Sequence, residues 1–141
     1  MTDRTFFDTN VLVYLWDHDQ PAKQATAERL VTQEVNSGLA VVSTQVLQEF
    51  YATVTRKLKP PLPDAEALAN TESFATLPVV QVDPVLILKA IRLSQLHRIS
   101  MWDALIVEAA LAADCRRLLT EDLQNGRRFG ELLIENPFAA T

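Results

Sequence analysis

Short apolar runs alternate with longer amphipathic segments along the chain, and this order constrains the fold more than any other feature. The apolar runs are a few residues long, which is typical of buried strands and too short for helices. The segments between them begin at capping residues or first-turn prolines and carry apolar residues at helical spacing. The pattern predicts strands at 6–7, 39–42, 79–82, 117–119 and 132–134, and helices at 21–36, 43–57, 64–74, 84–97 and 104–113.

This alternation predicts an α/β fold, with a mainly parallel sheet covered by helices on both faces. A length of 141 residues is enough for one domain with a single core, and no internal repeat divides the chain, so we expect one domain over residues 1–141. Ligands bind to such sheets at the carboxyl ends of the strands, near the point where the strand order reverses. Asp8 follows the first predicted strand and therefore lies at one of these ends.

The composition limits where the protein works and what it binds. No run approaches the roughly 18 apolar residues that a membrane span needs, and no signal sequence is evident. The single cysteine, Cys115, cannot form an internal disulfide. We therefore expect a cytoplasmic protein with no membrane partner. The net charge of -5 argues against a nucleic-acid partner at first sight, but acidic side chains that bind cations would change the effective charge of a binding face.

Asp8, Thr9 and Asn10 form a polar junction between two apolar runs. A carboxylate at this position is desolvated on at least two sides, which costs several kcal/mol unless something compensates it. The following residues, 11–16, permit either a strand or a helix. Two interpretations are therefore open: Asp8 caps a helix, or it binds a positively charged group.

Three further acids occupy informative places. Glu49 falls at the edge of the apolar stripe of its predicted helix, Asp103 lies at the start of a helix, and Asp122 comes directly after a strand. Each also has an ordinary explanation. Asp103 is suited to capping, Glu49 to reaching water at a boundary, and Asp122 with its neighbour Glu121 to a solvated turn.

Together these acids belong to elements that are expected to meet at one edge of a parallel sheet. Carboxylates brought together repel one another, and a divalent cation removes the conflict. Oxygen-only ligands favour Mg²⁺ or Mn²⁺ over Zn²⁺. Because such ions promote in-line attack at phosphorus, the pattern points to hydrolysis of phosphodiester bonds.

Four motifs in series resemble those of the PIN-domain ribonucleases, especially the VapC-type toxins of type II toxin–antitoxin systems. They are F-F-D-T-N-V-L-V-Y, Q-E-F, M-W-D-A-L-I-V-E-A-A and L-L-T-E-D-L. The resemblance implies a three-layer α/β/α fold and a metal-dependent endoribonuclease. The residues that match the acidic quartet of the family are Asp8, Glu49, Asp103 and Asp122.

The resemblance also implies roles for individual residues. Asp8 and Asp103 would bind Mg²⁺ or Mn²⁺, with Glu49 and Asp122 taking part directly or through water. Asn10 and Thr120 match supporting positions, and we expect Thr9 and Asn10 to donate hydrogen bonds that orient Asp8. The adjacent acid Glu121 leaves open which residue is the fourth ligand.

The toxin resemblance implies an RNA substrate, a cognate antitoxin and a homodimer. Phosphate contacts would come from whichever basic residues lie around the acidic site, and the candidates are Arg56, Lys57, Lys59, Arg116, Arg117, Arg127 and Arg128. The alternatives are a PIN-like interaction module without activity and an aspartyl-phosphate phosphatase. The phosphatase needs a second aspartate two residues after the first, where this chain has Asn10.

Overall fold

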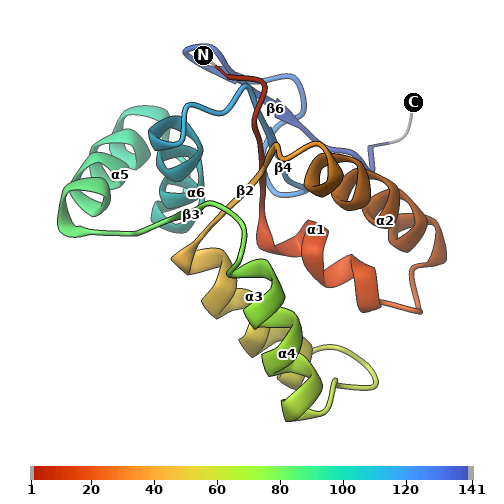
Figure 1. Ribbon diagram of the computed structural model, residues 1–141. Coiled ribbons are helices and arrows are strands. Elements are labelled where there is room, and N and C mark those ends of the chain that lie inside the picture. Colours follow the sequence, from red (N-terminus) through yellow and green to blue (C-terminus); the bar gives the residue numbers. More distant parts are fainter. Residues whose placement is uncertain (1, 140–141) are drawn as a thin grey trace.

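The computed structural model describes residues 2–139 and contains a six-stranded sheet of order β3-β2-β1-β4-β6-β5 (Figure 1). The first five strands in this order run parallel, and β5 is antiparallel to β6. The ends of the predicted domain, Met1 and residues 140–141, lie outside the described residues. The strands are β1 (Thr5–Phe7), β2 (Ala40–Ser43), β3 (Val79–Val80), β4 (Arg117–Leu119), β5 (Arg128–Phe129) and β6 (Leu132–Glu135).

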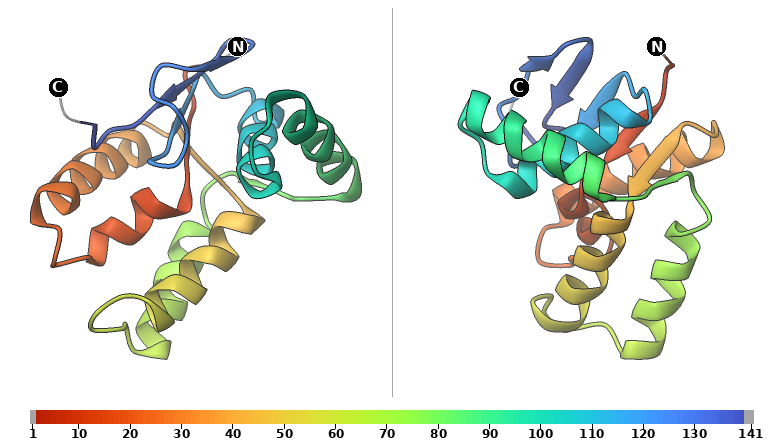
Figure 2. Two further views of the ribbon diagram at one scale, coloured as in Figure 1. Left: turned by 180° about the vertical axis from the view of Figure 1, so that it is seen from behind. Right: turned by 90° about the vertical axis from the view of Figure 1, so that its left-hand side faces the viewer.

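Helices cover both faces of this sheet, which confirms the predicted three-layer α/β/α fold (Figures 1 and 2). One layer is formed by α5 (Pro84–His97) and α6 (Met101–Ala112). The other contains α1 (Thr9–Val13), its 3-10 continuation η1 (Tyr14–Trp16) and α2 (Pro21–Asn36). The pair α3 (Thr44–Arg56) and α4 (Asp64–Phe74) projects beyond the carboxyl edge of the sheet.

The central strands β1, β2 and β4 are buried on both faces, apart from the partly exposed Arg117 at the start of β4. Phe6, Val42 and Leu118 are fully buried on three neighbouring strands, and this loss of apolar surface from water is the main stabilising contribution. Alanines of α6, including Ala104 and Ala110, are also fully buried and allow this helix to pack closely on the sheet. Within residues 2–139 no helix combines the length and apolar character needed to cross a bilayer.

The predicted elements all form, with differences at their ends and two additions. Residues 11–16 are helical, which settles the choice that the sequence left open. The third strand is limited to Val79–Val80, and α6 begins at Met101 rather than at residue 104. The strand β5 was not predicted: it has two residues and forms a hairpin with β6 through Gly130, whose φ of +62° favours glycine.

The strand order places the candidate residues together. From β1 the chain moves to β2 and β3 on one side, and then returns to β4 on the other side of β1. The order therefore reverses between β1 and β4, which pair in parallel with Phe7 opposite Leu119. As a result Asp8 and Thr120 meet at the carboxyl edge, at the kind of switch point where α/β proteins bind ligands.

Candidate active site

Asp8 is both a helix cap and a buried acid at the strand end. One carboxylate oxygen, Oδ1, accepts a hydrogen bond of 2.7 Å from the backbone N–H of Thr9, and Oδ2 accepts one of 2.7 Å from the hydroxyl of Thr120. Asp8 is only 5% exposed. The two interpretations left open by the sequence are therefore compatible, because capping α1 uses one oxygen and leaves the charge without a cationic partner.

Burial raises the pKa of the Asp8 carboxyl to about 7. The hydrogen bonds from Thr120 and Thr9 act in the opposite direction, and the negative charges of Asp122 and Glu49 raise the pKa further. These charges act on Asp8 because all three acids lie at the same edge of the sheet. Such a perturbed carboxyl is typical of a functional site.

Glu49 lies half-buried on α3, facing the first turn of α1. Its Oε1 accepts a hydrogen bond of 2.8 Å from the hydroxyl of Thr9, and its Oε2 accepts one of 3.4 Å from the side-chain amide of Gln45. The same amide donates to the backbone carbonyl of Trp102, at 3.3 Å. Gln45 therefore links α3 to the start of α6, a contact that the sequence did not indicate.

Asp103 lies in the first turn of α6, where Ser100 is the N-cap and accepts the N–H of Asp103 at 3.0 Å. Capping is therefore done by Ser100 rather than by Asp103. Burial raises the pKa of Asp103; the Ser100 hydroxyl opposes this, and the charges of Asp122 and Glu49 add to it. Asp103 is half-buried, and unlike Asp8, Glu49 and Asp122 it does not line the cavity between α1 and α3.

Asp122 and Glu121 point to different partners, although they are adjacent in the sequence. Asp122 accepts a hydrogen bond of 3.1 Å from the Asn10 side chain, and its backbone N–H donates to the hydroxyl of Thr120 at 3.1 Å. Glu121 is paired with Lys23 at 2.6 Å. This arrangement favours Asp122 over Glu121 as the fourth acid of the site.

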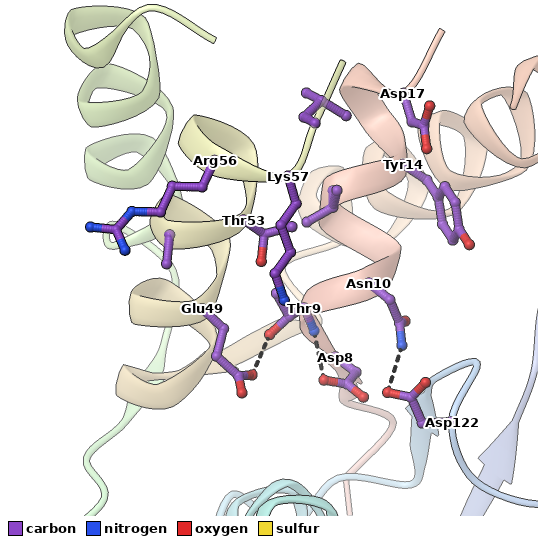
Figure 3. Close-up of a pocket in the computed structure, with 13 residues that line it drawn as sticks. Asp8, Thr9, Asn10, Tyr14, Asp17, Glu49, Thr53, Arg56, Lys57 and Asp122 are labelled. Atoms are coloured by element: carbon purple, nitrogen blue, oxygen red, sulfur yellow. Dashed lines mark hydrogen bonds between the residues drawn. The ribbon is translucent and has the colours of Figure 1, made fainter. Parts of the chain in front are cut away.

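The hydrogen bonds of Thr9 and Asn10 correct one expectation. Both residues were expected to orient Asp8, but only the backbone of Thr9 contacts it. The Thr9 hydroxyl donates to Glu49, and the Asn10 side chain donates to Asp122 (Figure 3). The polar junction therefore distributes its donors over three acids rather than concentrating them on one.

A cavity of about 620 Å³ opens between α1 and α3 and is lined by Asp8, Glu49 and Asp122. Arg56 and Lys57 line the same cavity, and in Figure 3 Lys57 extends from the end of α3 toward Thr9 and Asp8. The remaining lining residues are Thr9, Asn10, Val13, Tyr14, Asp17, Ala52, Thr53 and Leu58.

Not all of the basic residues singled out in the sequence lie here. Lys59 does not line the cavity. Arg117 begins β4, at the opposite edge of the sheet, where it pairs with Glu34 and Glu135. Tyr14 was missed, although its spacing of four residues from Asn10 places both on one helical face once α1 is assigned.

The acids of the site have the donor atoms that a divalent cation prefers, but their side chains are not arranged around one. None of Asp8, Glu49, Asp103 and Asp122 forms an ion pair with another residue of the described chain. Their donors are all oxygens, which suits Mg²⁺ or Mn²⁺. Among residues 2–139, however, no group of three or more His, Cys, Asp or Glu side chains is arranged so that it could hold a metal ion.

Comparisons with known proteins agree with this fold. A toxin–antitoxin complex from Klebsiella pneumoniae aligns with a TM-score of 0.69 and 14% identity, over 96% of this chain and 99% of that one. VapC20 from Mycobacterium tuberculosis, described as a Sarcin–Ricin loop cleaving toxin, aligns with a TM-score of 0.65 and 21% identity, over 81% and 86%. VapBC2 from Rickettsia felis, bound to a DNA fragment from its promoter, aligns with a TM-score of 0.65 and 19% identity, over 94% and 97%.

A comparison with curated protein sequences gave no match. The family described as the PIN domain, by contrast, matches residues 5–129 of the 141. This match includes β1, the acidic edge of the sheet and the turn that follows β4. Since it covers most of the chain, the chain belongs to the PIN-domain family.

Proposed function

We propose that this protein is a divalent-metal-dependent endoribonuclease that hydrolyses RNA phosphodiester bonds and acts as the toxin of a toxin–antitoxin pair. The observation that supports this most directly is that Asp8, Glu49 and Asp122, which have no cationic partners among the described residues, line a cavity together with Arg56 and Lys57. Negative charge binds the cation, and positive charge at the same cavity binds the phosphates of the substrate.

Asp8 and Asp103 are the proposed ligands of Mg²⁺ or Mn²⁺, with Glu49 and Asp122 binding directly or through water. The ion, when bound, would generate hydroxide from water near neutral pH and stabilise negative charge on phosphate oxygens. Thr120 holds Asp8 in place, and Thr9 and Asn10 do the same for Glu49 and Asp122. Ordering of these side chains before substrate arrives lowers the entropic cost of the reaction.

The proposed reaction on RNA is supported from outside the site as well. VapC20, which shares this fold, is described as a cleaving toxin. The phosphatase alternative is less favoured by the structure, since Asn10 donates to Asp122 and supplies no acid at the position that such enzymes need. An inactive interaction module would need this fold but not these closely placed acids, whose mutual repulsion costs free energy.

Partners follow from the same proposal. Two of the similar structures are complexes of the toxin–antitoxin class, so we expect a cognate antitoxin for this chain. A homodimer is supported by large exposed apolar side chains on α5, Val85, Leu88 and Leu96, which a second copy would cover. The expected cellular location is the cytoplasm.

An RNA cleavage assay tests the central claim. The purified protein is incubated with a mixed-sequence RNA in EDTA, in Mg²⁺ and in Mn²⁺, beside the variants Asp8→Asn and Asp103→Asn. We expect cleavage only when metal is present. We expect the cleavage rate of both variants to fall by at least about 100-fold, because each variant removes the charge of a proposed metal ligand.

Two further measurements separate the alternatives. Asp122→Asn is expected to reduce cleavage more than Glu121→Gln, because only Asp122 faces the other acids. Hydrolysis of a phosphate monoester, unaffected by RNA, would favour the phosphatase. Undiminished RNA cleavage by both Asp8→Asn and Asp103→Asn would refute the assignment of the site.

A further inference from the structure

Lys23, Tyr14 and Glu121 form a compact polar cluster beside the candidate site. Lys23 Nζ lies 2.6 Å from Glu121 Oε2, and the Tyr14 hydroxyl donates to Glu121 Oε1 at 2.5 Å. Lys23 also donates to the Tyr14 hydroxyl, at 3.1 Å. The three residues come from α2, η1 and the turn after β4, so the cluster joins the helical layer to the turn that carries Asp122.

Aromatic rings shield this cluster. Lys23 Nζ lies 4.9 Å from the centroid of the Tyr14 ring and 5.8 Å from that of Phe138, and the two rings pack edge to face at 4.8 Å. The Lys23 and Glu121 side chains are 33% and 27% exposed. Because the ammonium has a carboxylate, a hydroxyl and two rings as partners, the pair is held more firmly than an ordinary surface ion pair.

The Glu121 carboxylate finds its partners within this cluster, in Lys23 and Tyr14. Both carboxylate oxygens are occupied by these two donors. Glu121 therefore contributes no free oxygen to the cavity.

Asp122, one residue further on, has far fewer supports. It is exposed, and it is held by one hydrogen bond from Asn10 and by the bond from its backbone N–H to Thr120. Successive residues of this turn point in different directions, Glu121 toward α2 and Asp122 toward Asn10. Fixing Glu121 consequently fixes the backbone from which Asp122 extends.

We infer that Lys23 is a positioning residue for cation binding: it anchors Glu121, keeps that carboxylate out of the site and so sets the position of Asp122. This inference rests on the proposed function, because it assumes that Asp122 helps to bind the metal. Nothing in the sequence marks Lys23, which lies 98 residues before Glu121. The link arises only when α2 packs beside the turn after β4.

The variant Lys23→Met gives the sharpest test, because two explanations predict opposite signs. Removing a positive charge near an acidic site would by electrostatics alone strengthen Mn²⁺ binding. Loss of positioning would weaken it. We expect the Mn²⁺ Kd, measured by isothermal titration calorimetry on the full chain, to rise by about tenfold, the lower end of the effect of losing an outer support of a metal ligand.

Conservative variants refine the measurement. Lys23→Arg keeps the charge and the donors, and is expected to restore most of the affinity. Tyr14→Phe removes one donor to Glu121 without changing any charge, and is expected to weaken Mn²⁺ binding less than Lys23→Met does. If Lys23→Met fails to fold by circular dichroism, Tyr14→Phe tests the positioning of Glu121 without any change of charge, and unchanged Mn²⁺ binding by that variant would overturn the inference.

A matched control is the ion pair between Arg116 and Asp3, whose side chains are 68% and 75% exposed. Arg116→Met removes one positive charge far from the site and should leave the Mn²⁺ Kd unchanged. Unchanged or tighter Mn²⁺ binding by folded Lys23→Met, together with lost binding by Asp8→Asn, would overturn this inference alone. Mn²⁺ binding by Asp8→Asn equal to that of the original chain would overturn the proposed function.

Discussion

Asp8 and Glu34 are both only 5% exposed, yet the protein treats these two buried carboxylates differently at opposite edges of the sheet. At the amino edge Glu34 pairs with the Arg117 guanidinium and accepts a hydrogen bond from the Thr5 hydroxyl at 3.0 Å. At the carboxyl edge Asp8 has hydrogen-bond donors but no cation among the described residues. One acid is neutralised within the fold, and the other is left for a partner.

The difference supports a stabilising role for the amino edge and the proposed binding role for the carboxyl edge. A buried charge without a counter-ion is costly, so a fold selected only for stability would pair Asp8 as it pairs Glu34. Buried carboxyls with a perturbed pKa and no counter-ion are typical of functional sites. The comparison therefore supports the proposed site without any reference to sequence motifs.

The largest expected effect of this difference is the pH dependence of the free energy of unfolding that Asp8 causes. Its pKa in the folded state is about 7, above the ordinary value of 3.8 in the unfolded chain. The folded state therefore retains a proton that the unfolded state has lost, and this contribution to stability, complete below pH 4, disappears as the pH rises through 7. Relative to the original chain, Asp8→Asn should become more stable with rising pH, by up to about 4 kcal/mol above pH 7.

Urea unfolding of both proteins in EDTA, from pH 4 to pH 8.5, measures this effect. Asn retains the oxygen that caps α1, so capping is preserved in the variant. A difference in unfolding free energy that stays constant over this range would show that Asp8 is neutralised within the fold, as Glu34 is.

A smaller effect is expected at the amino edge. Arg117→Met leaves Glu34 buried without its cation and should lower the free energy of unfolding by about 3 kcal/mol at pH 7. The exposed pair of Arg116 and Asp3 is the control, and Arg116→Met should cost less than about 0.5 kcal/mol. Equal losses of unfolding free energy in Arg117→Met and Arg116→Met would mean that the burial of Glu34 does not increase the cost of removing its cation. The contrast between Glu34 and Asp8 would then be wrong.

The smallest effect concerns the hydroxyl that supports Asp8. Thr120 is fully buried, donates to Asp8 and accepts from the backbone of Asp122. Thr120→Val should lower the free energy of unfolding by about 2 kcal/mol in EDTA at pH 8, where Asp8 is charged, whereas Thr120→Ser keeps the hydroxyl and should cost less. If Ser is as destabilising as Val, the methyl group rather than the hydrogen bond supports the site.

The fold was largely predictable because most of its strands contain a short apolar run between turn or capping residues. The exception, β5, contains the exposed and charged Arg128, which gives no strand signal in two residues. Residues 11–16 were ambiguous because an apolar run of that length suits a strand or a helix.

The positions of the acids were predictable for the same reason, since strand ends and helix edges follow from the pattern. Their hydrogen-bond partners were not. Asn10 to Asp122 and Lys23 to Glu121 are contacts between segments about 100 residues apart, and they depend on which way each side chain turns after the layers have packed. Periodicity contains no information about these directions.

The placement of β4 beside β1 also has a consequence for the order of synthesis. Asp8 is synthesised before Thr120, whose hydroxyl holds it and which lies 112 residues later in the chain. Until that segment leaves the ribosome, one edge of β1 has no strand to pair with, because β4 is its neighbour there. The growing polypeptide therefore cannot assemble the acidic edge before β4 and Thr120 have been synthesised.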